Sequence, residues 1–550
     1  MEVKDREKVI DQVKAWVQSS PNDEEVIELR EHVRTRTMTT RALRRQKKKN
    51  SNHNYVCGKE LYDLLEPKDI LLKHRWLFAK EWVEYTPEEL EVDDFNHDAR
   101  GKGLARQRGN ALNEIFSKYG IQGLMDLIKK SVSNIQIGMY LHNDVLKKDE
   151  LTEFVLSGLN VDWDNPYEFD NCISGILLQM SEDEREQFIT NLIRRLPFEQ
   201  EKEDIILRMF LSSPFCRSTW NQLGKWSPEV QSEYWKKILP DLRDLSSIDF
   251  NFAVDKLLEA ERPFTAFNMV HFEFEKIESK CIVRLLKAIA CNTSEKDTHY
   301  KPSKHHIEQA LTTLNKRDDF DRMELTKLEY LYVDILHSHS SYGIPNLAKE
   351  VSESPLFFIQ LVAYRFERKG SGSDPDEWNI PQDEESKRIT ATKAYHVLDC
   401  LSVIPGTNKN GSIDVRQLRE WILQVRKFAK EHGREDNTDR QIGKLLSTSS
   451  EGEDGIWPRE EIREVFEEIG SSEISTGMEI GFHNSRGAEM RAIDSSRERS
   501  KAKKYQEMGN KVMNKNPFVG KMLNNIADMY KKQAEWWDED RRVNKRLGRW

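Results

Sequence analysis

Two short histidine groups are the first residues in this sequence that invite a chemical role. His305 and His306 are adjacent, and His337 and His339 flank a single serine. Imidazole nitrogens bind transition metals and act as general bases, but both roles need partner residues at defined spacing. No H-E-x-x-H, close cysteine pair or G-x-S-x-G sequence accompanies either group. We therefore interpret them as solvent-facing or helix-end histidines and assign no metal ligand and no catalytic residue.

The run from Gly406 to Gln417 comes closer to a metal-binding motif. It stands between two expected helices and has a glycine at its sixth place and an isoleucine at its eighth, as in the calcium-binding loop of an EF-hand. Gly406 and Gln417, however, replace the Asp and Glu that such a loop needs at its two ends. A second acidic turn, at residues 451–455, also ends in glycine. Both runs are interpreted as polar turns that cap helices, and no cofactor is expected.

Glycine-rich signatures of nucleotide binding are missing from the sequence. It contains no G-x-x-x-x-G-K-[ST] and no G-x-G-x-x-G run. Paired acids are numerous, as expected on the solvated faces of a chain with 94 acidic residues, and none stands near a candidate base. We therefore predict that the protein is not an enzyme. A catalytic site assembled from distant helices is the alternative that stays open.

The strongest single-sign charge feature is the stretch from Arg34 to Asn50, which holds eight basic residues and no acidic one. Such a run can neutralise the phosphates of a nucleic acid, although no aromatic residue is interleaved with it for base stacking. Basic residues near helix ends also complement the helix dipole. The candidate nucleic-acid contacts in this basic arm are Arg41, Arg44, Arg45, Lys47, Lys48 and Lys49.

A polar loop expected between Gly481 and Gly487 is the second candidate site. It offers His483, Asn484 and Arg486 within a few residues. Loops carry a large share of binding residues, whereas internal hydrogen bonds of a helix-to-helix connection are the commoner reason for such a composition. We name these three residues as a candidate recognition loop.

The elements that would position these residues are helices. From about Lys59 to Phe366, apolar residues recur at helical spacing, in short segments separated by Pro-containing or Asp-rich turns. The segment from Ser181 to Leu196 is an example, because Ser181 and Glu184 form a capping box at its start. Strand-like alternation is scarce. We predict an all-α fold, namely an irregular HEAT-like or TPR-like helical-repeat solenoid with a C-terminal helical domain and a helical hairpin.

Shifts in composition divide the chain into five parts. They are 1–58, N-terminal helices and the basic arm; 59–368, the helical-repeat array; 369–388, a linker; 389–487, a helical domain with two helix-loop-helix units; and 488–550, the helical hairpin. Four helices are expected in the fourth part before the polar loop. Pro517 is expected at the start of the second helix of the hairpin.

Composition and charge restrict the class of protein further. Apolar residues make up 37% and charged residues 33% of the chain, and the net charge is −9, which argues against a polyanion-binding protein as a whole. Six well-separated cysteines indicate reduced thiols. The sequence has no signal peptide and no apolar run of about 18 residues, so we expect a cytoplasmic protein without a membrane partner. Its oligomeric state is not predicted.

Several short segments late in the chain are distinctive, among them GSID at 411–414, DGIWP at 454–458 and NSRG at 484–487. Together they resemble the C-terminal part of large, uncharacterised bacterial proteins, over about the last two-thirds of this chain. The resemblance implies no catalytic residues. It suggests a link to bacterial antiviral defence, where helical arrays sense or bind partners. We therefore predict a non-enzymatic scaffold or recognition protein that binds another protein, with nucleic-acid association through the basic arm as the alternative.

Overall fold

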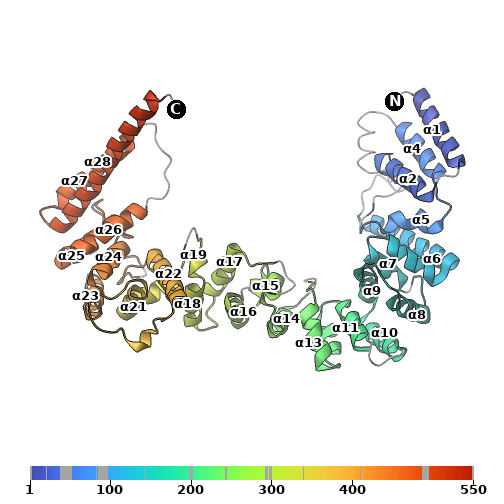
Figure 1. The fold of residues 1–550 in the computed structure, drawn as a ribbon, viewed down its shortest axis with the longest axis horizontal. Helices are drawn as coiled ribbons and strands as arrows, with labels where there is room; N and C mark the ends of the chain where they lie inside the picture. Colours follow the sequence, from blue (N-terminus) through green and yellow to red (C-terminus); the bar gives the residue numbers. More distant parts are fainter. Residues whose placement is uncertain are drawn as a thin grey trace. The chain divides into compact units, whose positions relative to one another are not determined.

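The regular secondary structure of the described residues is almost wholly helical. The computed structural model describes residues 3–19, 22–37, 53–81, 83, 97–142, 144–196, 202–241, 245–291, 295, 300–337, 340–408, 410–485 and 495–547. These ranges hold 27 α-helices, three short 3-10 helices and, in place of strands, two isolated β-bridges (Figure 1). The all-α prediction is confirmed. No helix in these ranges is both long enough and apolar enough to cross a membrane.

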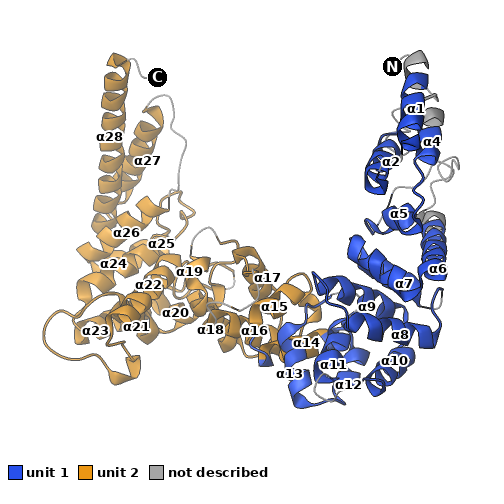
Figure 2. Cartoon of the chain, turned by 45° about the vertical axis from the view of Figure 1, so that its right-hand side comes forward, with its two compact units in different colours: residues 1–249, 259–261 blue, residues 250–258, 262–550 orange. Residues whose placement is uncertain are grey.

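The chain forms two compact units (Figure 2). Unit 1 comprises residues 1–249 and 259–261, and unit 2 comprises residues 250–258 and 262–550. The helices of unit 1 are α1 (Val3–Gln18), α2 (Asp23–Thr37), α4 (His53–Leu64), α5 (Ile70–His74), η1 (Arg75–Phe78), α6 (His97–Lys130), α7 (Asn134–Leu141), α8 (Lys148–Leu159), α9 (Tyr167–Gln179), α10 (Glu182–Arg194), α11 (Lys202–Leu211), α12 (Arg217–Leu223) and α13 (Pro228–Lys237).

Helix α14 (Ser247–Glu259) has residues in both units. The remaining helices belong to unit 2. They are α15 (Pro263–Val270), η3 (Phe274–Lys276), α16 (Ser279–Cys291), α17 (Lys304–Asn315), α18 (Arg322–Leu331), α19 (Val333–Leu336), α20 (Pro345–Glu353), α21 (Pro355–Arg365), η4 (Asp376–Trp378), α22 (Glu384–Cys400), α23 (Val415–Glu431), α24 (Glu435–Leu446), α25 (Glu460–Ile469), α26 (Ser472–Asn484), α27 (Ser496–Val512) and α28 (Pro517–Arg546).

Within each unit, helices pack mainly on helices that are close to them in the sequence. In unit 1, α7 packs on α9 and α11 packs on α13; in unit 2, α16 packs on α18 and α18 on α20. Contact between a helix and the next but one is typical of stacked antiparallel helices, because alternate helices then share a layer. The prediction of a helical-repeat fold is confirmed.

Local sequence signals explain where many helices begin. The Ser181 hydroxyl accepts a hydrogen bond from the Glu184 backbone N–H at 3.4 Å, and the Glu184 carboxylate accepts one from the Ser181 N–H at 2.9 Å. This is the expected capping box, and α10 follows it. The hydroxyls of Ser227 and Ser354 also cap α13 and α21 by accepting a backbone hydrogen bond, without the reciprocal glutamate, and a proline follows each in the first turn.

The predicted polar loop at 481–487 is wrong in its first half, because residues 472–484 form an additional helix, α26. Interior glycines such as Gly477 and Gly481 disfavour an isolated helix by about 1 kcal/mol each. In the structure, a Cβ atom at Gly477 would lie 2.1 Å from the carbonyl oxygen of Arg440 in α24. The glycines are therefore needed because the backbones of α24 and α26 approach each other closely.

Residues 369–388, the predicted linker, make several anchoring contacts. Trp378 is buried and its carbonyl accepts a hydrogen bond from the Tyr364 hydroxyl at 2.6 Å. Asp374 accepts two hydrogen bonds from the buried guanidinium of Arg434, at 2.6 and 2.7 Å. Helix α22 begins at Glu384, inside the predicted linker. The segment is thus packed within unit 2. The predicted boundaries of the five parts of the chain stay predictions.

Candidate recognition surface

The last turn of α26 carries two of the three residues predicted for the recognition loop. His483 and Asn484 are exposed on this turn. The neighbouring Phe482 packs its ring 5.0 Å from that of Tyr505 in α27 and 5.1 Å from that of Trp457, measured between centroids. This aromatic contact fixes the end of α26 against its neighbours, so His483 and Asn484 stand on a rigid helix end.

A shallow groove of about 360 Å³ runs beside this helix end. Five of its lining residues come from α26 and one from α28: Thr476, Glu479, Ile480, His483, Asn484 and Met529. Ile480 and Met529 supply apolar surface, and the imidazole and amide of His483 and Asn484 supply hydrogen-bonding groups at the edge. The groove therefore offers a mixed surface of the kind that accepts a protein side chain.

Glu479 is the only carboxylate among the residues that line this groove, and protein contacts hold it. Its Oε1 accepts hydrogen bonds from the Asn525 side-chain amide at 2.9 Å and from the Ser475 hydroxyl at 3.3 Å. Asn525 belongs to α28, so the carboxylate ties α26 to α28. No serine or cysteine nucleophile lines the groove. The arrangement of apolar and hydrogen-bonding groups is suited to binding.

Further exposed apolar side chains lie along α28, separated from Met529 and from one another by polar residues. Met529, Trp536 and Val543 are spaced by seven residues, so they lie on one face of the helix, and Leu547 follows four residues later. Trp536, Val543 and Leu547 keep 57%, 44% and 59% of their surface exposed. A row of exposed large apolar side chains is unusual on a helix that already packs against a neighbour. We call the groove and this row together the α26–α28 surface.

The antiparallel hairpin of α27 and α28 leaves Val543 and Leu547, but not Trp536, beyond the described part of α27. The two helices pack on each other, and Pro517 occupies the first turn of α28 as predicted. The Ser495 hydroxyl, just before α27, donates to Asp538 of α28 at 2.7 Å, and Arg499 pairs with the same carboxylate. The first described residues of α27 thus lie beside Asp538, and α28 continues for about two more turns, to Arg546.

No protein-family model matches this chain, and no curated protein matches it significantly.

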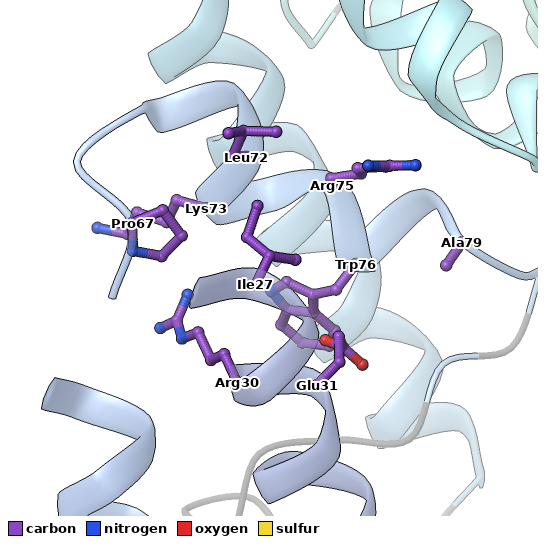
Figure 3. A pocket seen from close by; sticks show the side chains of 9 residues that line it. All are labelled: Ile27, Arg30, Glu31, Pro67, Leu72, Lys73, Arg75, Trp76 and Ala79. Atoms are coloured by element: carbon purple, nitrogen blue, oxygen red, sulfur yellow. The ribbon is translucent and has the colours of Figure 1, made fainter. Parts of the chain in front are cut away.

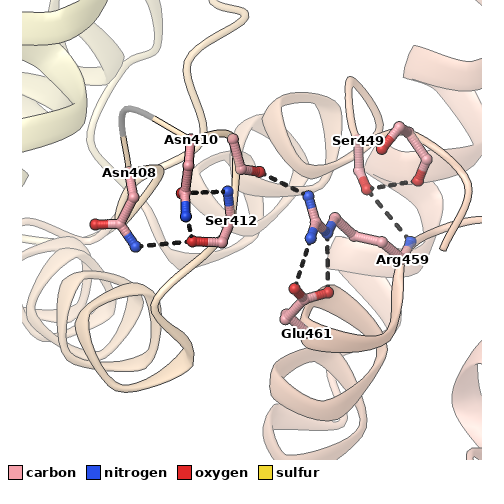
Figure 4. Close-up of polar contacts among 8 residues, drawn as sticks. Asn408, Asn410, Ser412, Ser449, Arg459 and Glu461 are labelled. Carbon is pink, nitrogen blue, oxygen red and sulfur yellow. Dashed lines mark hydrogen bonds and ion pairs between the residues drawn. The ribbon is translucent and has the colours of Figure 1, made fainter. Parts of the chain in front are cut away.

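The two loops that resemble metal-binding loops lie side by side in unit 2 and are joined by one arginine (Figure 4). Arg459 forms two hydrogen bonds to the Glu461 carboxylate, at 2.6 and 2.8 Å, and donates a third to the Gly411 carbonyl at 2.9 Å. In the first loop, Asn410 accepts hydrogen bonds from the backbone N–H and hydroxyl of Ser412. The guanidinium thus connects the first loop to the start of α25, which follows the second loop.

Carboxylates in and beside these loops have protein partners. Asp414 caps α23 by accepting from two backbone N–H groups, at 2.9 and 3.1 Å. A hydrogen bond from Arg459 lowers the pKa of Glu461. Partial burial alone would raise the pKa of Asp454, but its ion pair with Arg463, at 2.6 Å, is among the contacts that bring it below the usual value. In the described ranges, no three His, Cys, Asp or Glu residues are grouped to hold a metal.

Most of the remaining candidate residues from the sequence lie outside the described ranges. These are His339, Arg486 and six residues of the basic arm, namely Arg41, Arg44, Arg45, Lys47, Lys48 and Lys49. Arg34, at the start of the arm, is described and buried. It pairs with Glu31 at 2.9 Å and stacks over the Trp76 ring at 4.9 Å. This residue therefore has a packing role.

The predicted histidine groups acquire partners that the sequence pattern did not indicate. His306 lies 4.4 Å from His271, and His337 stacks on His396 at 3.8 Å, measured between ring centroids. His305 is exposed, 5.8 Å from His306. Burial is the largest cause of the lowered pKa of His306. These contacts join helices far apart in the sequence, so no spacing rule reveals them.

Proposed function

We propose that this chain is a non-enzymatic helical scaffold that binds another protein through the α26–α28 surface. The observation that carries the proposal is the exposed row of Trp536, Val543 and Leu547, on the same helix as Met529, which lines a groove edged by His483 and Asn484. Aromatic residues that stay exposed on a rigid helix are typical anchors of protein interfaces. The resemblance noted in the sequence supports a role in a bacterial defence system for this binding, and the expected location is the cytoplasm.

An amphipathic helix is the partner element that fits this surface best. Apolar residues at Met529, Trp536 and Val543 repeat every seven residues, and a second helix with the same repeat packs on such a row by inserting its side chains between them. The polar groups of His483 and Asn484, at the end of the groove, then limit which side chain the partner presents there.

Site-specific photo-crosslinking in cells tests this function. A photoreactive phenylalanine analogue replaces Trp536 in one full-length variant and Tyr167 in a control variant; Tyr167 is also highly exposed, at 73%, but belongs to α9 in unit 1. We expect one defined protein adduct at position 536 and none at 167. Adding Val543→Ser should weaken the adduct at 536, because it removes a neighbouring apolar contact.

Two results would reject the proposal. The first is an absence of any protein adduct at 536 when the variant is expressed in its native context. The second is substrate turnover by the purified chain that survives Trp536→Ser and Val543→Ser. Loss of the adduct through unfolding is excluded by requiring both variants to keep the helical circular dichroism spectrum of the unmodified chain.

The second candidate function is nucleic-acid association through the basic arm. It is favoured by the run of eight basic residues without an acidic one from Arg34 to Asn50. The test is binding of a labelled duplex and a labelled single strand across a salt series. Binding should fall steeply with salt and disappear when the arm is neutralised at residues 44, 45 and 47–49. Absent or salt-independent binding rejects this candidate.

A further inference from the structure

A cavity of about 180 Å³ lies in unit 1 between α2 and the pair α5 and η1 (Figure 3). Its walls are largely apolar and include Ile27, Pro67, Leu72 and the indole of Trp76. Cavities of about 150 Å³ with apolar walls bind a benzene ring. The space therefore suits one ring-sized apolar group.

Arg30 borders this cavity and is the reason to assign it a ligand. The residue is only 8% exposed. Its Nε donates to the Tyr62 carbonyl at 3.2 Å, and its guanidinium carbon lies 4.0 Å from the centre of the Tyr62 ring. In the described part of the chain it has no carboxylate partner, and its two Nη atoms make no hydrogen bond. These Nη atoms are not among the fully buried atoms that lack a partner, so they keep contact with solvent and are accessible to a ligand.

The other charges around the cavity leave it electropositive. Lys73 is neutralised by Glu66 at 2.8 Å, and Glu31, the one acidic residue among those that line the cavity, is neutralised by Arg34 at 2.9 Å. Arg75 donates from Nε to the Lys130 carbonyl at 2.8 Å and, like Arg30, has no carboxylate partner in the described residues. Within that part of the chain, two guanidinium groups therefore remain without a counter-charge.

We propose that this cavity binds a small organic carboxylate that carries a single ring-sized apolar group. The carboxylate would accept two parallel hydrogen bonds from the Nη atoms of Arg30, which is the geometry that guanidinium groups favour. The apolar group would lie against Trp76 and Leu72, and Arg75 would add positive potential at the edge. The site lies in unit 1, so it is independent of the α26–α28 surface.

Benzoate is the probe for this site, and titration calorimetry with the full-length chain is the measurement. We expect saturable binding of benzoate, and at least about tenfold weaker binding of benzamide, because a neutral amide forms no charge-assisted pair with Arg30. Inorganic phosphate distinguishes the contribution of negative charge to binding from that of the apolar ring. It should bind at least about tenfold more weakly than benzoate, since it leaves the apolar walls without a contact.

Three variants locate the binding. Arg30→Met keeps the length of the side chain and should weaken benzoate binding about tenfold or more. Ala79→Trp leaves Arg30 in place and fills the cavity from the exposed rim, so it should abolish binding even if Arg30→Met proves unstable. Arg194→Met removes an exposed guanidinium elsewhere in unit 1 and should leave binding unchanged.

The assignment is overturned by any of three results. These are no saturable benzoate binding to the unmodified chain, equal binding of benzoate and phosphate, or benzoate binding that both Arg30→Met and Ala79→Trp leave intact.

Discussion

Glu329 shows how much one buried carboxylate contributes to the array. It is fully buried, and its two oxygens accept hydrogen bonds from the Tyr342 hydroxyl, the Asn346 side chain and the Leu347 backbone N–H at the start of α20, each at 2.7 Å. Burial raises the pKa of Glu329, against the opposing effect of these donors. Removing the carboxylate leaves several buried donors unsatisfied, which costs far more than one ordinary hydrogen bond.

We therefore expect Glu329→Ala to lower the free energy of unfolding by about 2–3 kcal/mol and to speed amide exchange at Leu347. Glu329→Gln keeps one acceptor oxygen and should cost roughly half as much. Hydrogen exchange followed by mass spectrometry of α20 peptides, together with thermal unfolding, measures both. Equal effects of the two substitutions would contradict the role given to the second oxygen.

Cys216 and Cys400 are half-buried to a similar extent but differ in chemistry. At Cys216, burial alone would raise the thiol pKa, yet hydrogen bonds with Ser218 and Thr219 and the charge of Arg185 outweigh it, so the pKa is lowered. At Cys400, burial raises the pKa to about 11. The thiolate is the reactive form, and a lower pKa leaves more of it at neutral pH.

Alkylation with iodoacetamide should therefore be faster at Cys216 than at Cys400 at pH 7. The ratio should shrink as the pH rises towards 11, where Cys400 also ionises. Peptide mass spectrometry of a time course at several pH values measures the two rates. The expectation fails if Cys400 reacts as fast as Cys216 at pH 7.

At the scale of single elements, capping signals predicted helices better than interior composition did. Ser181 with Glu184 and the Ser-Pro pairs at 227–228 and 354–355 begin helices where expected, because a cap acts through backbone groups only a few residues away. Helix α26 was missed because Gly477 and Gly481 are unfavourable in an isolated helix. The compensating gain is contact with α24, about 35 residues earlier, which no local pattern contains.

This explanation of α26 predicts opposite effects for two glycine substitutions. Gly477→Ala places a Cβ 2.1 Å from the Arg440 carbonyl, so α24 and α26 must separate, and the chain should lose about 1–3 kcal/mol of stability. Gly109 lies inside α6, and a Cβ added there would have no neighbouring atom within 4 Å, so Gly109→Ala should stabilise by about 0.5–1 kcal/mol. Denaturant unfolding of the two variants compares them. A neutral Gly477→Ala would refute the close packing.

At the scale of the whole molecule, the sequence predicted the fold class but only part of the candidate surfaces. His483 and Asn484 were selected from a polar run, and they do border a groove. The sequence could not show that Met529 forms the apolar wall of this groove, because that depends on the packing of α26 against α28. The Arg30 cavity gave no signal, because its lining residues come from segments about 40 residues apart and only their packing leaves Arg30 without a counter-charge.

The two compact units also predict how the full chain unfolds. Each unit has its own buried centre: Arg108 in unit 1 is 2% exposed and donates to the carbonyls of Leu77 and Lys80, whereas Glu329 anchors unit 2. Chains with more than one such centre usually depart from two-state unfolding. Scanning calorimetry should therefore give more than one transition, with a calorimetric enthalpy larger than the van't Hoff enthalpy of either.

Variants assign these transitions. Arg108→Met should lower one transition by roughly 5–10 °C, since it leaves buried carbonyls without donors, and Glu329→Ala should lower the other by a similar amount. Arg194→Met, on an exposed position of α10, is the control and should move neither. A single transition with equal calorimetric and van't Hoff enthalpies, shifted by both core substitutions, would mean that the 550 residues unfold as one cooperative body.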